Sequence, residues 1–210
     1  MFHWMLLSRN NNGGCLVQLP EKSYGRIELA VRKIIRMGHP TLRKVARPLS
    51  DSEILSDEIA RLVSDMTDTL HDYGGIGLAA PQVNESVRLA LIEIPSEGSR
   101  YGDLESLSLT VFVNPTVSIL DSPCAGFWEG CLSVPGLRGW VERPQCVRVD
   151  YKDLELGEHS QEFSGFQATV IQHEFDHLDG VLYVDRIADM KQLLFEEEFE
   201  RLAKLGNTVD

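Results

Sequence analysis

The chain has 210 residues, a hydrophobic content of 43% and a formal net charge of −12. This length suits one globular domain with a single core. The negative charge argues against a nucleic-acid binder, which needs a positive surface. No apolar run approaches the ~18 residues of a membrane-spanning helix, so we expect no membrane segment.

Residues 1–34 form the least patterned part of the chain, and they lack the continuous apolar stretch of a secretory signal. We expect an N-terminal extension that is poorly ordered or accessory. A start codon assigned too early is the favoured explanation. An organelle import signal fits less well, because Glu21 and Glu28 are acidic. Residues 35–210 then form the single folded domain.

Periodicity predicts the elements between residues 56 and 120. A helix capped by Ser56 carries apolar residues at helical spacing up to Leu70 and should end at Gly74. We expect strands over residues 87–94, 109–113 and 117–120, with a loop rich in Gly and Ser over 95–108 between the first two.

Further strands are expected over residues 145–151 and 159–163, joined around Gly157. A buried helix should follow, with Ser164 as its N-cap and Gly180 in a left-handed conformation at its end. A final amphipathic helix should carry the apolar residues Met190, Leu194, Phe195, Phe199 and Leu202. The predicted class is α+β, with mostly antiparallel strands packed around a central helix and a C-terminal amphipathic helix.

The central helix carries His173-Glu174-Phe175-Asp176-His177, an H-E-x-x-H motif. Positions i and i+4 lie on one helix face, so both imidazoles can reach one metal ion, and Glu174 lies beside them to handle a proton. The histidines continue an apolar stripe with Phe166 and Val170, so the site should be partly buried. Burial favours the neutral, metal-binding imidazole.

The third ligand decides the class of enzyme, and two candidates remain open on this ground. A zinc protease of the thermolysin type would take a downstream carboxylate, for which Glu196, Glu197, Glu198 and Glu200 are candidates. The metzincin pattern is excluded, because Tyr183 stands where its third histidine would be. Upstream, Cys131 would complete a tetrahedral site of one thiolate and two imidazoles with a position open for water.

A third segment, Gly75-Ile76-Gly77-Leu78-Ala79-Ala80-Pro81-Gln82, combines small residues with an amide donor. Small residues allow another chain to approach the backbone closely. The Gln82 amide is a suitable donor to a developing oxyanion. A purely structural metal module would need neither this donor nor Glu174.

Together, the segments 75–82, 129–133 and 172–177 resemble the three ordered motifs of the peptide deformylase family, G-φ-G-φ-A-A-x-Q, E-G-C-φ-S and Q-H-E-φ-D-H. The resemblance covers about residues 35–203. It implies a hydrolase that removes the N-formyl group from the initiator methionine of new polypeptides and releases formate.

The resemblance also implies residue roles. The metal ligands would be Cys131, His173 and His177, and the general acid and base would be Glu174. Oxyanion donors would be the Gln82 side chain and the Leu132 backbone N–H. The substrate backbone would meet Ile76, Gly77 and Gly130 as an added strand, and Phe127, Glu129, Phe166 and Val170 would border the methionine pocket. Arg138 matches an arginine of the family, and we consider a pair with Glu129.

Zinc is the usual ion in a tetrahedral N/S site. The resemblance instead implies one Fe²⁺ ion physiologically, which makes Cys131 oxygen-sensitive, with Zn²⁺, Ni²⁺ or Co²⁺ as substitutes in purified protein. The other cysteines, Cys15, Cys124 and Cys146, form no disulfide framework, which favours a reducing, cytoplasmic setting. The resemblance implies N-formylmethionyl peptides as partners and ribosome docking through the C-terminal region, which the acidic residues there disfavour.

Overall fold

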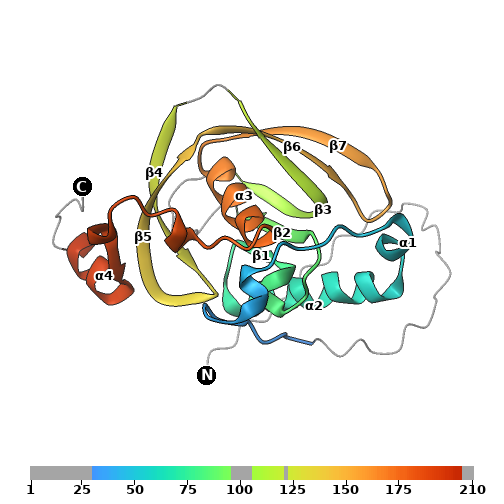
Figure 1. Cartoon of the computed structure of the whole chain (residues 1–210), viewed down its shortest axis with the longest axis horizontal. Helices are drawn as coiled ribbons and strands as arrows, with labels where there is room; N and C mark the ends of the chain where they lie inside the picture. The colour runs from blue at the N-terminus through green and yellow to red at the C-terminus, as the bar shows by residue number, and fades with distance from the viewer. Residues whose placement is uncertain (1–29, 96–105, 121–122, 205–210) are drawn as a thin grey trace, which may run out of the picture.

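The computed structural model describes residues 30–95, 106–120 and 123–204, and its elements form two antiparallel sheets around one buried helix. The larger sheet has the strand order β1-β2-β3-β6-β7 and the smaller one the order β4-β5-β8 (Figure 1). The strands of the larger sheet are β1 (Gly77–Ala79), β2 (Leu89–Ile94), β3 (Leu107–Ile119), β6 (Cys146–Lys152) and β7 (Glu158–Ser164). Those of the smaller sheet are β4 (Cys124–Cys131), β5 (Val134–Pro144) and β8 (Leu193–Phe195).

The buried helix is α3 (Gly165–Leu178), which packs against β1, β2 and β7 and lies beside the β4–β5 hairpin (Figure 1). Every residue from Gln167 to Leu178 except Gln172 is buried. The predicted start and end are confirmed, and Gly180 takes a left-handed conformation with φ of 73°. Ser164 occupies the N-cap position but its side chain makes no capping hydrogen bond. There the chain passes from β7 into α3 through the left-handed Gly165, whose N–H binds the Gln145 carbonyl.

Helix α2 (Asp57–Tyr73) confirms the predicted capping at both ends. The Ser56 side chain accepts the Ile59 N–H, and Gly74 ends the helix in a left-handed conformation with φ of 63°. Buried Leu62, Met66 and Leu70 share a core with residues of β2. The short helix α1 (Asp51–Ile54) precedes α2, and the 3-10 turns η1 (Pro40–Arg43) and η2 (Ala80–Val83) lie on either side of the pair in sequence.

Two of the predicted strands, 109–113 and 117–120, are one strand in the structure. β3 runs from Leu107 through Pro115, with a register shift between Val113 and Thr116. Asn114 takes a positive φ of 50° there, and its side chain bonds both the N–H and the carbonyl of Leu49. A bulge held in this way lets a strand continue through a proline. Most of the predicted loop 95–108 lies outside the described residues.

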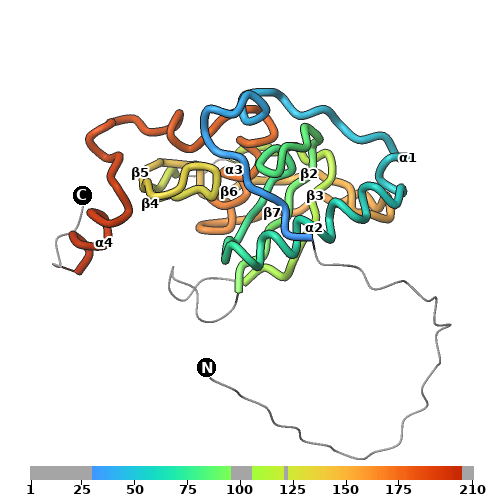
Figure 2. Tube along the Cα trace, turned by 90° about the horizontal axis from the view of Figure 1, so that it is seen from below, coloured from blue at the N-terminus to red at the C-terminus, as the bar shows by residue number. Residues whose placement is uncertain are grey.

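The predicted C-terminal helix begins later than its apolar spacing indicated. Residues from Met190 form the 3-10 turn η4 (Met190–Gln192) and then β8, which pairs with β5. Only α4 (Glu196–Lys204) is helical, and none of its residues is buried. Figure 2 shows α4 at the edge of the molecule beyond β4 and β5. Pairing with β5 outweighed the helical pattern in this segment.

The packed body starts before residue 35. Ile34 is buried in the core, and the Arg32 guanidinium pairs with Asp65 (3.0 Å) and Glu85 (2.8 Å). No helix in the described ranges combines the length and the apolar character that crossing a lipid bilayer requires.

Candidate metal centre

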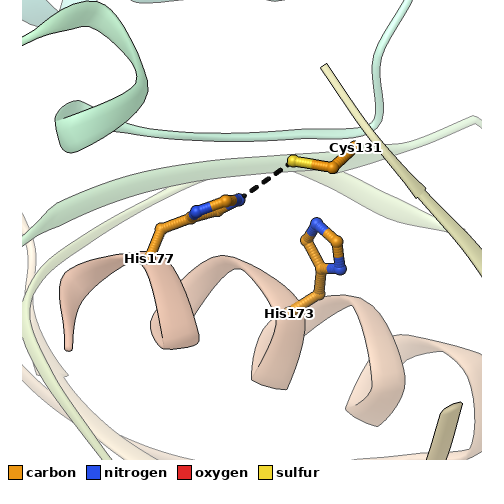
Figure 3. A group of neighbouring side chains, drawn as sticks. All are labelled: Cys131, His173 and His177. Atoms are coloured by element: carbon orange, nitrogen blue, oxygen red, sulfur yellow. Dashed lines mark hydrogen bonds between the residues drawn. The ribbon is translucent and has the colours of Figure 1, made fainter. Parts of the chain in front are cut away.

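Three side chains from two elements converge at the centre of the molecule. His173 and His177 project from one face of α3 toward Cys131, which ends β4 (Figure 3). Cys131 Sγ lies 3.3 Å from His177 Nε2. One ligating atom from each of the three residues lies within 4.8 Å of the other two. In the part of the chain that the structure describes, this is the one such group of three or more His, Cys, Asp or Glu residues.

The position of Cys131 follows from the β4–β5 hairpin. Sequence reasoning did not predict these two strands. Cys131 pairs with Val134 at the turn between β4 and β5, and the Ser133 N–H points at its sulfur at 3.4 Å. The tight turn therefore holds the sulfur over the face of α3. Its surroundings include Val134, Leu42 and Tyr183, which form a small core of their own.

The chemistry of the donor set fits a divalent ion. Thiolate and imidazole are both ligands of tetrahedral zinc sites, and three protein ligands leave a fourth position open, as in catalytic sites. Burial lowers the pKa of His177 well below its ordinary value, so that this ring is neutral. Burial acts in the same direction on His173, but hydrogen bonds and charges of Cys131 and Glu129 outweigh it and raise its pKa. Cation binding must therefore displace a proton from this site.

The downstream carboxylates do not join the three donors. Glu196 begins α4 and accepts hydrogen bonds from Arg138 Nε (3.1 Å) and Nη2 (2.6 Å). The proposed Arg138–Glu129 pair is therefore wrong, since Glu129 binds other partners. The carboxylate ligand of a thermolysin-type site is not found among the described residues.

Glu129 belongs to a buried polar network behind His173. Its Oε2 lies 2.7 Å from His173 Nδ1, and its two oxygens accept from Arg143 Nε (2.6 Å) and Nη2 (3.1 Å). Arg143 Nη1 also donates to Asp176 Oδ2 (2.9 Å), and Arg186 holds the other oxygen of Asp176 (2.7 Å). Burial opposes ionisation of Glu129, but His173 and Arg143 outweigh it and lower its pKa. This network fixes the ring orientation of His173.

Sequence reasoning missed Arg143, Asp176 and Tyr183 as parts of this site. Asp176 lies inside the H-E-x-x-H motif, so its position in the sequence could have indicated it. Arg143 lies on β5, and only the folded structure brings it to Asp176 of α3. The Tyr183 ring stacks on His173, with centroids 5.9 Å apart. Tyr183, which stands where the metzincin pattern has its third histidine, therefore supports one face of the His173 ring.

Glu174 is 5% exposed, and its Oε2 is buried without a hydrogen-bond partner. Burial raises the pKa of this carboxyl to about 7. The close approach of Gly77 encloses it, because a Cβ built on Gly77 would lie 2.6 Å from Glu174 Cγ. A carboxyl with a pKa near neutrality can both accept and donate a proton at physiological pH.

Gln82 lies on η2 and is 1% exposed. Its Oε1 accepts the Ala79 N–H (2.8 Å), which leaves Nε2 facing Cys131 Sγ at 3.5 Å and Ser133 Oγ at 3.4 Å. The amide donor is thereby oriented toward Cys131, one of the three clustered side chains. Leu132, the other predicted donor, follows Cys131 and lines the same cleft.

A cleft of about 830 Å³ opens over these residues. Its lining includes Ile76 and Gly77 on one side and Gly130 and Leu132 on the other. These segments border or belong to β1 and β4, each of which lies at one edge of its sheet. A smaller adjoining pocket of about 60 Å³ is lined by residues that include the predicted set Phe127, Glu129, Phe166 and Val170.

This combination of donor set, buried carboxyl and cleft is that of a mononuclear metal-dependent hydrolase. Comparison with known proteins gives the family. The model of the polypeptide deformylase family matches residues 31–193. A peptide deformylase of Leptospira biflexa is 41% identical over 177 residues, covering 84% of this chain and 99% of that protein. Peptide deformylase 1 of Prochlorococcus marinus is 45% identical over 177 residues, covering 82% and 88%.

Solved structures agree with the sequence relatives. A class I type b peptide deformylase of Acinetobacter baumannii, in a crystal structure with bound Met-Ala-Ser, has a TM-score of 0.73 and 37% identity, covering 76% of this chain and 99% of that one. A peptide deformylase of Synechococcus elongatus in complex with actinonin has a TM-score of 0.67 and 31% identity, covering 94% and 97%.

The chain belongs to the peptide deformylase family. Its members are metal-dependent hydrolases that remove the N-formyl group from nascent polypeptides, and this is the activity of the enzyme described here. The expectations for family, α+β fold and reaction are confirmed, and the protease alternative is set aside.

Proposed function

We propose that Cys131, His173 and His177 hold the divalent ion of this deformylase and that Glu174 is its general base and acid. The observation that carries the proposal is the convergence of Cys131 of β4 with His173 and His177 of α3, beside the buried Glu174 carboxyl, whose Oε2 has no hydrogen-bond partner. A divalent ion held by these residues would act as a Lewis acid and lower the pKa of a bound water toward neutrality.

The residues around the ion then move the proton and stabilise charge. Glu174 accepts a proton from the attacking water and delivers it to the leaving amine of methionine. The Gln82 amide and the Leu132 N–H donate hydrogen bonds to the formyl oxygen as it becomes negative. The fixed orientation of the Gln82 amide supports this role, because its oxygen is already bound by Ala79.

The substrate peptide, in this proposal, extends between the edge strands β1 and β4 and hydrogen-bonds to the main chain near Ile76, Gly77 and Gly130. Its methionine side chain enters the smaller pocket bordered by Phe127, Glu129, Phe166 and Val170. The Met-Ala-Ser bound to the Acinetobacter relative supports a short peptide that begins with methionine as the ligand.

We further propose Fe²⁺ as the physiological ion, with Zn²⁺, Ni²⁺ or Co²⁺ able to replace it in purified protein. A thiolate ligand lowers the net charge of the centre and suits each of these ions. Oxidation of Cys131 would release the ion. Metal analysis of protein purified without oxygen tests the assignment: iron in equimolar amount supports it, and zinc alone contradicts it.

The proposed setting is the cytoplasm, where the enzyme reaches N-formylmethionyl peptides as they leave the ribosome. Direct RNA binding is not part of the proposal, because α4 begins with Glu196, Glu197 and Glu198 and the chain carries a net charge of −12. Co-sedimentation with ribosomes tests the association. It is measured at low salt and after a wash in about 0.5 M salt, where the Debye length is roughly 4–5 Å. Absence of the enzyme from the ribosome pellet at low salt contradicts it.

Turnover tests the residue roles. The enzyme, kept anaerobic, is assayed for formate release from formyl-Met-Ala, with unformylated Met-Ala as the control. We expect Glu174→Ala to retain one metal ion per chain and to lose about 10²–10⁴-fold in turnover. A Glu174→Ala protein that retains its metal and deformylates at the wild-type rate would contradict the role of Glu174.

A further inference from the structure

The wall of the cleft next to Gly130 is built from two charged residues that come from different parts of the chain. Arg138 lies on β5 and Glu196 begins α4, and both line the cleft. Arg138 Nε and Nη2 donate to Glu196 Oε1 at 3.1 Å and 2.6 Å. The Arg138 side chain is 12% exposed and the Glu196 side chain 36%.

Local structure fixes where this pair lies. Arg138 pairs with Leu194 of β8, so the C-terminal strand delivers Glu196 to the same edge of the hairpin. On the other side, the guanidinium covers Gly130, since a Cβ built on Gly130 would lie 2.8 Å from Arg138 Cζ. Gly130 immediately precedes the ligand Cys131. The pair therefore lies beside the main chain along which the proposed substrate extends.

Glu196 lies beyond residue 193, where the match to the family model ends. The carboxylate that engages Arg138 is thus supplied by a segment outside the part of the chain that the family model describes. A guanidinium in the wall of a peptide cleft would otherwise attract acidic side chains through charge-assisted hydrogen bonds. Two of its nitrogens are instead bound to Glu196.

We propose that Glu196 is a specificity-determining residue: by binding Arg138 in the cleft wall, it prevents the enzyme from favouring substrates with an acidic residue downstream of methionine. The inference rests on the proposed strand-like path of the substrate past Gly130. Glu196 acts on the substrate through Arg138, so it is a positioning residue in this account.

The experiment compares kcat/KM for formyl-Met-Ala-Asp and formyl-Met-Ala-Lys, each amidated at its C-terminus so that only the third side chain differs in charge. Formyl-Met-Ala amide, which lacks the third residue, reports the basic reaction. We expect Glu196→Gln to raise the Asp-to-Lys ratio of kcat/KM about tenfold, the equivalent of one charge-assisted hydrogen bond. The matched control Glu197→Gln removes the same charge from the exposed neighbouring position and should change the ratio less than about threefold.

The dependence on Arg138 separates this mechanism from a general effect of charge. In an Arg138→Gln background, Glu196→Gln should change the ratio less than about threefold, because the guanidinium that Glu196 binds is absent. A ratio that changes less than threefold in the single Glu196→Gln variant overturns the inference, as does an equal change in the Arg138→Gln background. Failure of the proposed function would look different, because wild-type enzyme would then leave formyl-Met-Ala amide intact.

Discussion

Glu129 Oε2 lies 2.7 Å from His173 Nδ1, and both groups are buried. The contact joins the hairpin that carries Cys131 to the helix that carries both histidines. Because one ring nitrogen of His173 is engaged by Glu129, the other is directed toward the sulfur. Of the three proposed metal ligands, His173 is therefore held by a carboxylate that is not itself one of them.

Removing that carboxylate should weaken metal binding while the three ligands stay in place. We expect Glu129→Ala to lower zinc affinity about 10–100-fold, the usual cost of losing such a supporting partner. Glu129→Gln, which keeps an acceptor for His173 but not the charge, should fall between Glu129→Ala and the wild type. Competition with a chromophoric chelator measures the affinity. Wild-type affinity in Glu129→Ala would show that His173 needs no such support.

Arg143 should matter for stability more than any surface arginine. Replacing it with Met leaves the carboxylates of Glu129 and Asp176 buried with fewer partners, which should cost about 3–5 kcal/mol in the free energy of unfolding. Urea denaturation measures the loss. Arg148→Met, which breaks the exposed pair with Glu162 on the neighbouring strands, is the control and should leave the midpoint almost unchanged. Equal losses in the two variants would contradict a structural role for the buried network.

Gly77 should be required for the correct position of the Glu174 carboxyl. A methyl group at this residue would overlap Glu174, since a Cβ there lies 2.6 Å from both Cγ and Cδ. We expect Gly77→Ala to keep its metal and to lose about 10²-fold in turnover, as displacement of a catalytic group by about 1 Å commonly does. Metal content and formate release are measured on the same sample. Full activity in Gly77→Ala would mean that turnover does not need the close approach of β1 to α3.

The metal-free enzyme should lose stability as the pH rises toward the raised pKa of Glu174. Burial raises the pKa of this carboxyl from 4.5 to about 7, so the folded state retains a proton that the unfolded chain has lost. Stability from this group is full below pH 4.5 and is lost as the pH rises to about 7. Glu174→Gln lacks the decline, so its unfolding free energy relative to wild type should rise by about 3 kcal/mol between pH 4.5 and pH 8. Urea denaturation of chelator-treated protein at both pH values measures it, and parallel curves would contradict the shift.

Sequence reasoning predicted α3 and its histidine pair well because the signals were local. An i, i+4 spacing and a glycine after the last turn lie within a few residues of each other. The same holds for α2, whose Ser56 and Gly74 mark its ends. Cys131 was one of two candidates for the third ligand, and only the resemblance favoured it, since nothing in its local sequence separated it from a buried, inert cysteine.

Long-range contacts were less predictable. The hairpin β4–β5 carries Gly126, which accommodates Trp140, and a Trp128–Trp140 pair with ring centroids 5.8 Å apart. Such cross-strand packing leaves no strict alternation in the sequence. A pair of Arg138 with Glu129 was considered, but Arg143 bonds to Glu129 and Arg138 to Glu196. The pairing of β8 with β5, which the helical pattern from Met190 concealed, brings Glu196 to Arg138.

X-ray absorption at the metal edge of the zinc-loaded enzyme tests whether Cys131, His173 and His177 together bind the ion. We expect one sulfur ligand at about 2.3 Å and two imidazole nitrogens at about 2.0–2.1 Å, with the sulfur absent in Cys131→Ala. A spectrum of the wild-type enzyme with nitrogen and oxygen ligands and no sulfur would contradict it.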